Sequence, residues 1–192
     1  MVKQRIAGED ELDFPSRYAC VNYQIPKPFA PLAQGPELLD EALAQQRTDH
    51  TALPMVSIDA PDTGDIDDAL CARSLADGWE LLIAIADPSS AITPDSPLDR
   101  EALRRGSTAY LPHFKSTMLP AELSENLFSL KAGVERPAIV CRFEVSANGE
   151  IRDSEFTVAK IRSRAQLSYA ELNPHLRAGT LPEHLDPDVQ QS

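Results

Sequence analysis

A concentration of negative charge between two apolar segments constrains this chain more than any other feature. The segment VSIDAPDTGDIDDAL, residues 56–70, contains five aspartates: Asp59, Asp62, Asp65, Asp67 and Asp68. Two unit charges about 4 Å apart repel by roughly 1 kcal/mol in water, and by several-fold more near a low-dielectric surface. A free acidic turn would be solvated, but this loop is bracketed by strand-like segments, MVSI and ALCARSL, that would hold it against a sheet.

The spacing of the aspartates suggests what compensates their repulsion. Asp65, Asp67 and Asp68 follow Asp59 at distances along the chain that allow a strand end and a tight turn to bring oxygens to one point. Hard divalent cations prefer oxygen ligands, and Mg²⁺ typically takes one or two carboxylates together with waters and substrate phosphate. Two such ions stabilise the attacking and leaving oxygens of a phosphodiester displacement. The pattern therefore predicts a divalent-cation site that bridges an acidic protein to an anionic substrate.

Two rival motifs overlap the same loop. The triplet Asp62-Thr63-Gly64 is the DTG of aspartic proteases, whose chemistry needs two such carboxylates sharing a proton in a protected apolar pocket. The chain has one copy, further acids surround it, and only a homodimer would supply the second, so this alternative is remote. A calcium EF-hand loop that starts at Asp65 would need Gly at Leu70 and Glu at Ala76, and it is excluded.

Charge and cysteine content limit the remaining classes. The 192 residues carry a net charge of −12, which argues against a free-standing nucleic-acid binder because phosphate contacts need a positive surface. No apolar run approaches the roughly 20 residues that span a bilayer, and the N-terminus lacks a signal-peptide core, so we expect a cytoplasmic protein. The three cysteines form no CxxC pair, and we expect Cys71 and Cys141 to be reduced core residues.

Turn and cap signals predict an α+β (mixed α/β) fold with antiparallel hairpins and packed helices. Asp77-Gly78 and Asn148-Gly149 each separate two strand-like runs and predict hairpins. Ser96 followed by Pro97 predicts the start of a helix, and residues 36–46 have the spacing of a short amphipathic helix.

Both ends of the chain lack such regular patterns. Residues 1–36 contain five prolines and predict an extended segment that wraps the surface. From residue 173 to 192 the chain is rich in Pro and Asp, which predicts an irregular tail.

Several polar residues near these elements have structural interpretations. Asp87 ends an apolar run, and a capping or supporting role is favoured over a catalytic one. Arg104 and Arg105 fall late in the helix after Ser96, where a solvated cationic face suits the helix dipole. Ser124 and Glu125 are expected to cap a short helix.

Four collinear blocks resemble the ribonuclease II family, whose catalytic domain is the RNB domain. SIDAPDTGDIDDAL resembles the family's aspartate motif, and LLIAIADPSSAI resembles an apolar strand that ends in Ile-Ala-Asp. AYLPHF…TMLPAELSENLFSL and ERPAIVCRFEVSANGEI resemble the segments that follow. The resemblance covers residues 37–172, which would be the N-terminal half of that domain, and it is closer to ribonuclease II proper than to the ribonuclease R branch.

The resemblance implies a processive, Mg²⁺-dependent 3′-to-5′ exoribonuclease that hydrolyses single-stranded RNA to nucleoside 5′-monophosphates, with Mn²⁺ as a substitute ion. By position, four aspartates match family residues that bind metal directly or through water and organise the attacking water: Asp59, Asp65, Asp67 and Asp68. Asp67 matches the one whose loss is most damaging, whereas Asp62 lies where the family varies.

Tyr110 matches a family tyrosine that packs on the terminal nucleotide. Base stacking on an aromatic side chain is worth roughly 1–3 kcal/mol, enough to hold a 3′ end in register. The alternative role for Tyr110 is that of an aromatic residue which closes the preceding helix against the core.

The resemblance also implies parts that these residues do not match. In the family, cold-shock and OB-type domains precede the catalytic domain, and its second half carries a catalytic arginine before a further OB-type domain. We therefore expect a fragment or truncated form, in which the metal site survives in part and hydrolysis is weak or absent. A non-catalytic RNB-like binding module is the main alternative, and the oligomeric state is left open.

Overall fold

The computed structural model describes residues 14–29, 40, 42–112 and 114–191. The chain divides into two compact units, which are treated one at a time below. The first unit comprises residues 1–33 with 92–121, and the second comprises residues 34–91 with 122–192. None of the helices within the described residues has the length and hydrophobicity of a membrane-spanning segment.

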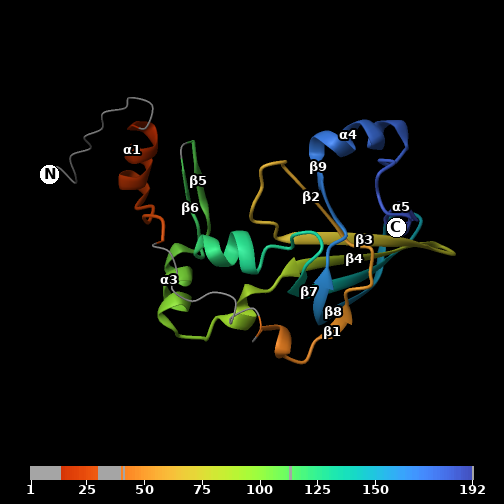
Figure 1. Cartoon of the computed structure of the whole chain (residues 1–192), viewed down its shortest axis with the longest axis horizontal. Coiled ribbons are helices and arrows are strands. Elements are labelled where there is room, and N and C mark those ends of the chain that lie inside the picture. The colour runs from red at the N-terminus through yellow and green to blue at the C-terminus, as the bar shows by residue number, and fades with distance from the viewer. Residues whose placement is uncertain (1–13, 30–39, 41, 113, 192) are drawn as a thin grey trace. The chain divides into compact units, whose positions relative to one another are not determined.

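A seven-stranded mixed sheet forms the second unit (Figure 1). The strands are β1 (Thr48–His50), β2 (Val56–Asp59), β3 (Asp68–Leu75), β4 (Gly78–Ala86), β7 (Glu135–Val145), β8 (Ile151–Arg162) and β9 (Ala165–Ser168). Their order is β1-β8-β7-β4-β3-β2-β9, with parallel pairs only at the two edges, β1 with β8 and β2 with β9. The predicted mixed fold class is therefore confirmed.

Both predicted hairpins are present, because their turn residues supply the backbone angles that tight reversals need. The β3–β4 hairpin pairs Leu75 with Gly78, whose φ is 128°. A Cβ at Gly78 would lie 2.0 Å from the backbone oxygen of Val145, so only glycine allows the neighbouring strand to come this close. In the β7–β8 hairpin, Gly149 has φ 83° and its N–H donates to the Ser146 carbonyl at 2.9 Å.

One face of this sheet carries the main core. Cross-strand partners share a face, so the pairings Cys71–Leu82, Ala84–Val140 and Ala138–Ala159 align small and aliphatic side chains across four strands. These residues pack with Met55, Ile66, Leu130 and Ile161 as one buried cluster. Both Cys71 and Cys141 are buried and reduced, as predicted, and burial raises the pKa of the Cys71 thiol to about 11.

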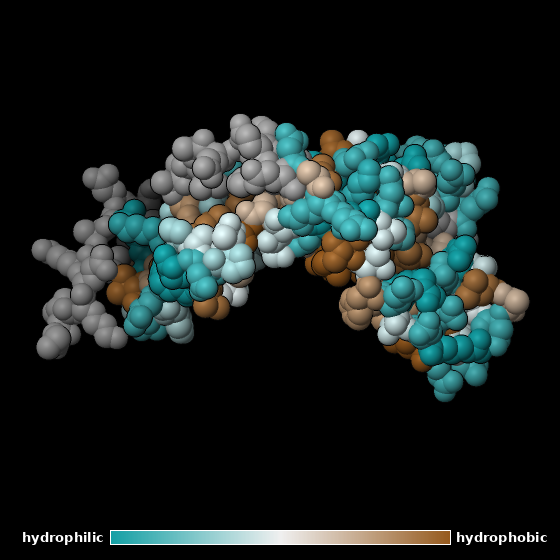
Figure 2. All heavy atoms as spheres, turned by 90° about the horizontal axis from the view of Figure 1, so that it is seen from below, coloured by the Kyte–Doolittle hydropathy of each residue, from teal (hydrophilic) through white to brown (hydrophobic). Residues whose placement is uncertain are grey.

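The opposite face of β4, β7 and β8 exposes large apolar side chains. The register places Trp79, Ile85, Ile151, Phe156 and Val158 on it, and their exposed fractions run from 47% to 73%. Figure 2 shows one side of the molecule, on which hydrophobic surface lies between hydrophilic areas. Trp79 lies beside the turn of the β3–β4 hairpin and is about half exposed.

Two helices include residues 173–178 and 187–191, so the prediction of an irregular tail is wrong over these residues. Helix α4 (Tyr169–Ala178) starts at a capping box between Ser168 and Glu171 and ends at Gly179. Helix α5 spans Pro187–Gln191. A second core cluster joins these helices to the sheet through Val56, Leu167, Leu172, Leu185 and Val189. Pro174 lies inside α4, which continues through it.

The prediction of an extended N-terminal segment is also wrong over residues 14–23. Helix α1 (Phe14–Tyr23) occupies these residues. Pro15 is tolerated in its first turn, where an N–H has no intrahelical partner, and no further proline occurs before Pro26. Residues 1–13 and 30–36 of that prediction lie outside the described residues. Within the predicted helix 36–46, residues 40 and 42–44 are helical.

In the first unit, helix α3 (Pro97–Arg105) begins as predicted. The Ser96 side chain accepts a hydrogen bond from the Asp99 N–H at 3.1 Å, and Pro97 is the first helical residue. Strands β5 (Ala109–Leu111) and β6 (Phe114–Ser116) form a separate two-stranded sheet.

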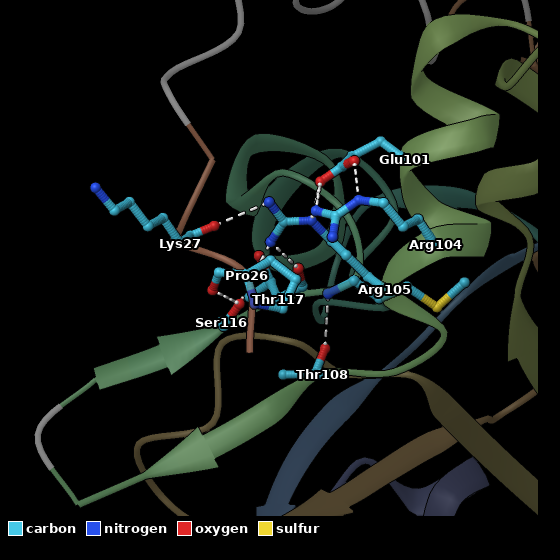
Figure 3. Close-up of polar contacts among 9 residues, drawn as sticks. Pro26, Lys27, Glu101, Arg104, Arg105, Thr108, Ser116 and Thr117 are labelled. Atoms are coloured by element: carbon cyan, nitrogen blue, oxygen red, sulfur yellow. Dashed lines mark hydrogen bonds and ion pairs between the residues drawn. The ribbon is translucent and has the colours of Figure 1, made fainter. Parts of the chain in front are cut away.

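Arg105 is buried, which corrects the prediction that it lies on a solvated face. Its guanidinium donates to the carbonyl oxygens of Lys27 at 2.9 Å and Thr117 at 3.0 Å (Figure 3). It also pairs with Glu101 at 2.8 Å and lies 3.7 Å from the centre of the Phe29 ring. Arg104 is exposed and pairs with the same Glu101. Arg105 therefore ties residues 27–29 to α3.

A buried ion pair links two segments of the second unit. Arg47, just before β1, donates to Asp87, just after β4, at 2.9 Å, and their side chains are 1% and 8% exposed. Arg47 also donates to the backbone oxygens of Ala42 and Ala159. Asp87 thus has the structural role that its position suggested.

We expect Asp87→Asn to lower the free energy of unfolding by about 3–5 kcal/mol, because it leaves the Arg47 charge buried without its counter-ion. Urea titration measures this loss. Asp77→Asn is the matched control, since it removes the partner of Arg152 at an exposed pair worth at most about 1 kcal/mol. Equal losses in the two variants would contradict the expectation.

Candidate metal centre

The four predicted aspartates lie at the facing ends of two neighbouring strands. Asp59 is the last residue of β2 and Asp68 is the first of β3, while Asp65 and Asp67 lie in the connection between them. Ile66 separates those two aspartates and is only 1% exposed. The buried Ile66 side chain therefore anchors the connection to the main core and keeps the acidic residues beside the sheet.

Backbone hydrogen bonds fix this connection on both sides. The Ala86 N–H donates to the Asp67 carbonyl at 2.8 Å, which joins the connection to the end of β4. The Leu130 N–H donates to the Ile66 carbonyl at 2.9 Å, and the Ser129 hydroxyl accepts from the Ile66 N–H at 3.1 Å. The backbone between Gly64 and Asp68 is therefore held by β4 and by the segment after residue 128.

The pKa values of two of these aspartates show that the carboxylates repel one another. Desolvation is the largest cause that raises the pKa of Asp59, followed by repulsion from Asp68 and Asp65. Desolvation also leads the causes that raise the pKa of Asp67, followed by repulsion from Asp65, Asp68 and Asp59. Each of the four predicted aspartates thus contributes to one repulsive field, which a bound cation would relieve.

Two further observations bear on whether these residues fit a divalent ion. The Oδ2 atom of Asp59 is buried and has no hydrogen-bond partner in the structure, which is costly unless something else satisfies it. Within the described part of the chain, however, no group of three or more His, Cys, Asp or Glu side chains closes on a common point. This geometry fits a magnesium ion that takes one or two carboxylates directly and the others through water.

Glu125 is a neighbour of this loop that the sequence had not suggested. It lies within a π-helix, η3 (Leu123–Leu127), and not at a cap, which corrects the predicted capping role of Ser124 and Glu125. Its Oε2 atom is 3.6 Å from the point that a Cβ on Gly64 would occupy. A fifth carboxylate therefore approaches the aspartate loop from a segment some 60 residues further along the chain.

Tyr110, the fifth predicted site residue, belongs to the other unit. It lies in β5, and 69% of the residue is exposed. That exposure contradicts the alternative in which Tyr110 closes a helix against the core. Asp62, which the prediction leaves out of the site, is exposed in the turn that follows β2.

Comparison with known proteins gives a consistent result over most of the chain. The RNB domain model matches residues 47–190. Exoribonuclease 2 of Escherichia coli strain UMN026 is 47% identical over 149 residues, which cover 77% of this chain and 23% of that protein. The chain thus spans about a quarter of the length of the curated relatives that it matches.

Solved structures of Mycoplasma genitalium RNase R have the same fold. The complex with double-stranded RNA gives a TM-score of 0.83 at 27% identity, over 98% of this chain and 34% of that one. The complex with ribose-methylated single-stranded RNA gives 0.81 at 26% identity, over 97% and 30%. The predicted resemblance is confirmed, and identity is higher to the Exoribonuclease 2 sequence than to these RNase R structures.

The raised pKa of Asp67 predicts a gain in stability when its charge is removed. At pH 7 without divalent ions, we expect Asp67→Asn to raise the free energy of unfolding by about 0.5 kcal/mol, a small value because solvent screens the repulsion. Urea titration in the presence of a chelator measures the gain.

The pH dependence of the free energy of unfolding tests whether the charge of Asp67 causes the gain in stability. A raised pKa means that the folded protein holds the proton more tightly than the unfolded chain, so the penalty applies at neutral pH. It disappears as the pH falls through the folded pKa of Asp67 toward the ordinary value of 3.8. Asp62→Asn, in the same loop, is the control. A variant Asp67→Asn no more stable than the wild type at pH 7 would show that the repulsion is absent.

Proposed function

Because this chain belongs to the RNB family, we propose that it forms the aspartate-bearing part of a magnesium-dependent exoribonuclease. The activity would be hydrolysis of single-stranded RNA from the 3′ end to nucleoside 5′-monophosphates. The observation that carries the proposal is the grouping of Asp59, Asp65, Asp67 and Asp68 at adjoining strand ends, where burial and then mutual repulsion raise the pKa of Asp59 and Asp67. The names of its relatives, Exoribonuclease 2 and RNase R with bound RNA, support the same activity.

The four aspartates would hold the ion and order water around it. Asp59 offers a buried oxygen without a hydrogen-bond partner, which suits a direct ligand. Asp67 lies between Asp65 and Asp68, and its backbone is hydrogen-bonded to β4. In the proposed mechanism its carboxylate would orient a water molecule toward a phosphate. A bound Mg²⁺ would neutralise the carboxylates and stabilise charge that develops on the phosphodiester oxygens. Mn²⁺ would serve as a substitute.

Tyr110 would provide the sequence-independent contact with RNA. Every base has a π face, so stacking on one exposed aromatic ring holds a terminal nucleotide whatever its identity. The exposed position of Tyr110 in β5 supports this role.

A non-catalytic RNB-like module is the second candidate. It is favoured by the net charge of −12, since phosphate contacts need a positive surface. We propose accordingly that hydrolysis by the 192 residues alone is weak or absent, while a cation still binds. The aspartic-protease alternative is disfavoured because Asp62 is exposed in a turn, whereas a protease dyad needs a protected apolar pocket.

Cation binding separates these candidates. We expect isothermal titration calorimetry to detect binding of Mg²⁺ and Mn²⁺ to the chain. Asp59→Asn and Asp67→Asn should each weaken the affinity at least about tenfold. Loss of an outer-shell partner of a metal ligand costs tenfold to a hundredfold in affinity, and these two carboxylates lie nearer to the ion than such partners. Asp62→Asn makes the same charge change in the same loop and should leave the affinity within about twofold.

Absence of binding to the wild type, or equal weakening by Asp62→Asn, would contradict the metal site. The first outcome would favour the non-catalytic candidate. The second would mean that the ion merely responds to the net charge of the loop.

RNA binding tests the role of Tyr110. We expect Tyr110→Ala to weaken binding of a fluorescent single-stranded oligonucleotide by about 1–3 kcal/mol, because the base loses its stacking partner. Tyr110→Phe keeps the ring and should bind nearly as well as the wild type, which fluorescence anisotropy would establish. If both variants bind as the wild type does, Tyr110 does not contact the RNA.

A further inference from the structure

Two buried polar side chains hold the aspartate loop from the side of the core. The Ser129 hydroxyl, in a residue 1% exposed, accepts from the Ile66 N–H at 3.1 Å and donates to the Gly64 carbonyl at 2.8 Å. These two peptide groups lie on either side of Asp65. A single hydroxyl therefore bridges the backbone that carries Asp65 and leads into Asp67.

The Ser129 residue is in turn held by Arg136 on β7. The guanidinium of Arg136 donates through Nε to the Ser129 carbonyl at 3.0 Å and through Nη2 to the Asn126 carbonyl at 3.2 Å. Its Nη1 atom donates to the Glu135 carbonyl at 3.0 Å. Arg136 is buried, and a buried guanidinium is costly unless its N–H groups find acceptors. Arg136 therefore fixes the turn between Asn126 and Ser129.

We propose that Ser129 and Arg136 are positioning residues for the aspartate site, which hold the Gly64–Ile66 backbone so that Asp65 and Asp67 face one cation. This inference rests on the proposed function, because it assumes that the aspartates bind an ion. Both residues are buried, and their side chains hydrogen-bond to backbone groups of the protein. Their effect passes through the backbone. Arg136 fixes the position of Ser129, and Ser129 fixes the backbone of Gly64 and Ile66. That backbone determines where the two carboxylates lie.

Repulsion within the loop is the reason that such positioning matters. Without an ion, the like charges of Asp65 and Asp67 favour a backbone that separates them. Removing the Ser129 hydroxyl leaves a buried donor and a buried acceptor without their partner, which is energetically costly. The loop backbone is then no longer held in place, and a shift of the loop would relieve that cost. A preformed site binds more tightly than one that must first be assembled.

The test compares variants of the whole 192-residue chain at a temperature where far-UV circular dichroism shows each to be folded. Ser129→Ala removes the hydroxyl, Ser129→Thr keeps it, and Ser154→Ala changes an exposed strand serine as the control. Arg136→Lys keeps the charge but offers an ammonium that cannot reach both carbonyl groups in the same geometry. Each variant is titrated with Mn²⁺ by electron paramagnetic resonance, and amide hydrogen exchange is measured at Ile66 and at Ala84.

We expect Ser129→Ala and Arg136→Lys to lose roughly tenfold or more in Mn²⁺ affinity, as outer-shell changes at metal sites do. The Ile66 amide should exchange faster in Ser129→Ala, while Ala84 in the core of the sheet should be unchanged. Ser129→Thr should recover most of the affinity, and Ser154→Ala should match the wild type. A purely structural role would lower global stability without changing affinity in the folded protein.

Two failures are distinguishable. If the wild type binds Mn²⁺ and Ser129→Ala binds it equally well, the positioning role is overturned while the proposed function stands. If the wild type binds no Mn²⁺ at all, the proposed function fails and the positioning role falls with it.

Discussion

Repulsion among carboxylates at the ends of two neighbouring strands is the constraint on which the organisation of the second unit depends. Burial, followed by repulsion from neighbouring aspartates, raises the pKa of Asp59 and Asp67. The loop that carries these residues is nevertheless kept beside a buried core by Ile66 and by hydrogen bonds from β4 and the segment after η3. A surface loop with this charge would normally extend into solvent. That it is instead tied down on both sides is the strongest physical indication of a cation-dependent role.

Arginines make the buried polar connections in both units. Arg47, Arg105 and Arg136 each place a guanidinium where little water reaches it and direct it at backbone carbonyl oxygens. The fork of five N–H donors lets one side chain satisfy several carbonyl groups that have no place in a strand or helix. In this way the guanidinium groups hydrogen-bond irregular segments to the rest of their own unit.

What the sequence predicted well was local. The hairpin at Asn148-Gly149 and the start of α3 at Ser96 depend on the conformational preferences of a few adjacent residues, and the aspartate motif lies within ten residues. The sequence did not predict the helices at residues 14–23 and after residue 172, because the proline content outweighed weaker signals. One such signal is the capping box that Ser168 and Glu171 form at the start of α4. The roles of Arg105 and Ser129 were beyond reach, since their partners lie 78 and 63 residues away along the chain.

The apolar side chains on the open face of β4, β7 and β8 affect how the chain behaves in solution. Exposed hydrophobic side chains draw copies of a protein together, whereas a net charge of −12 keeps them apart. The balance between the two is set by ionic strength, because salt screens the long-range repulsion and leaves hydrophobic attraction intact. Dilute, low-salt buffers should therefore keep the chain dispersed, and concentrated or salty ones should promote self-association, so any assay of the aspartate site must control both conditions.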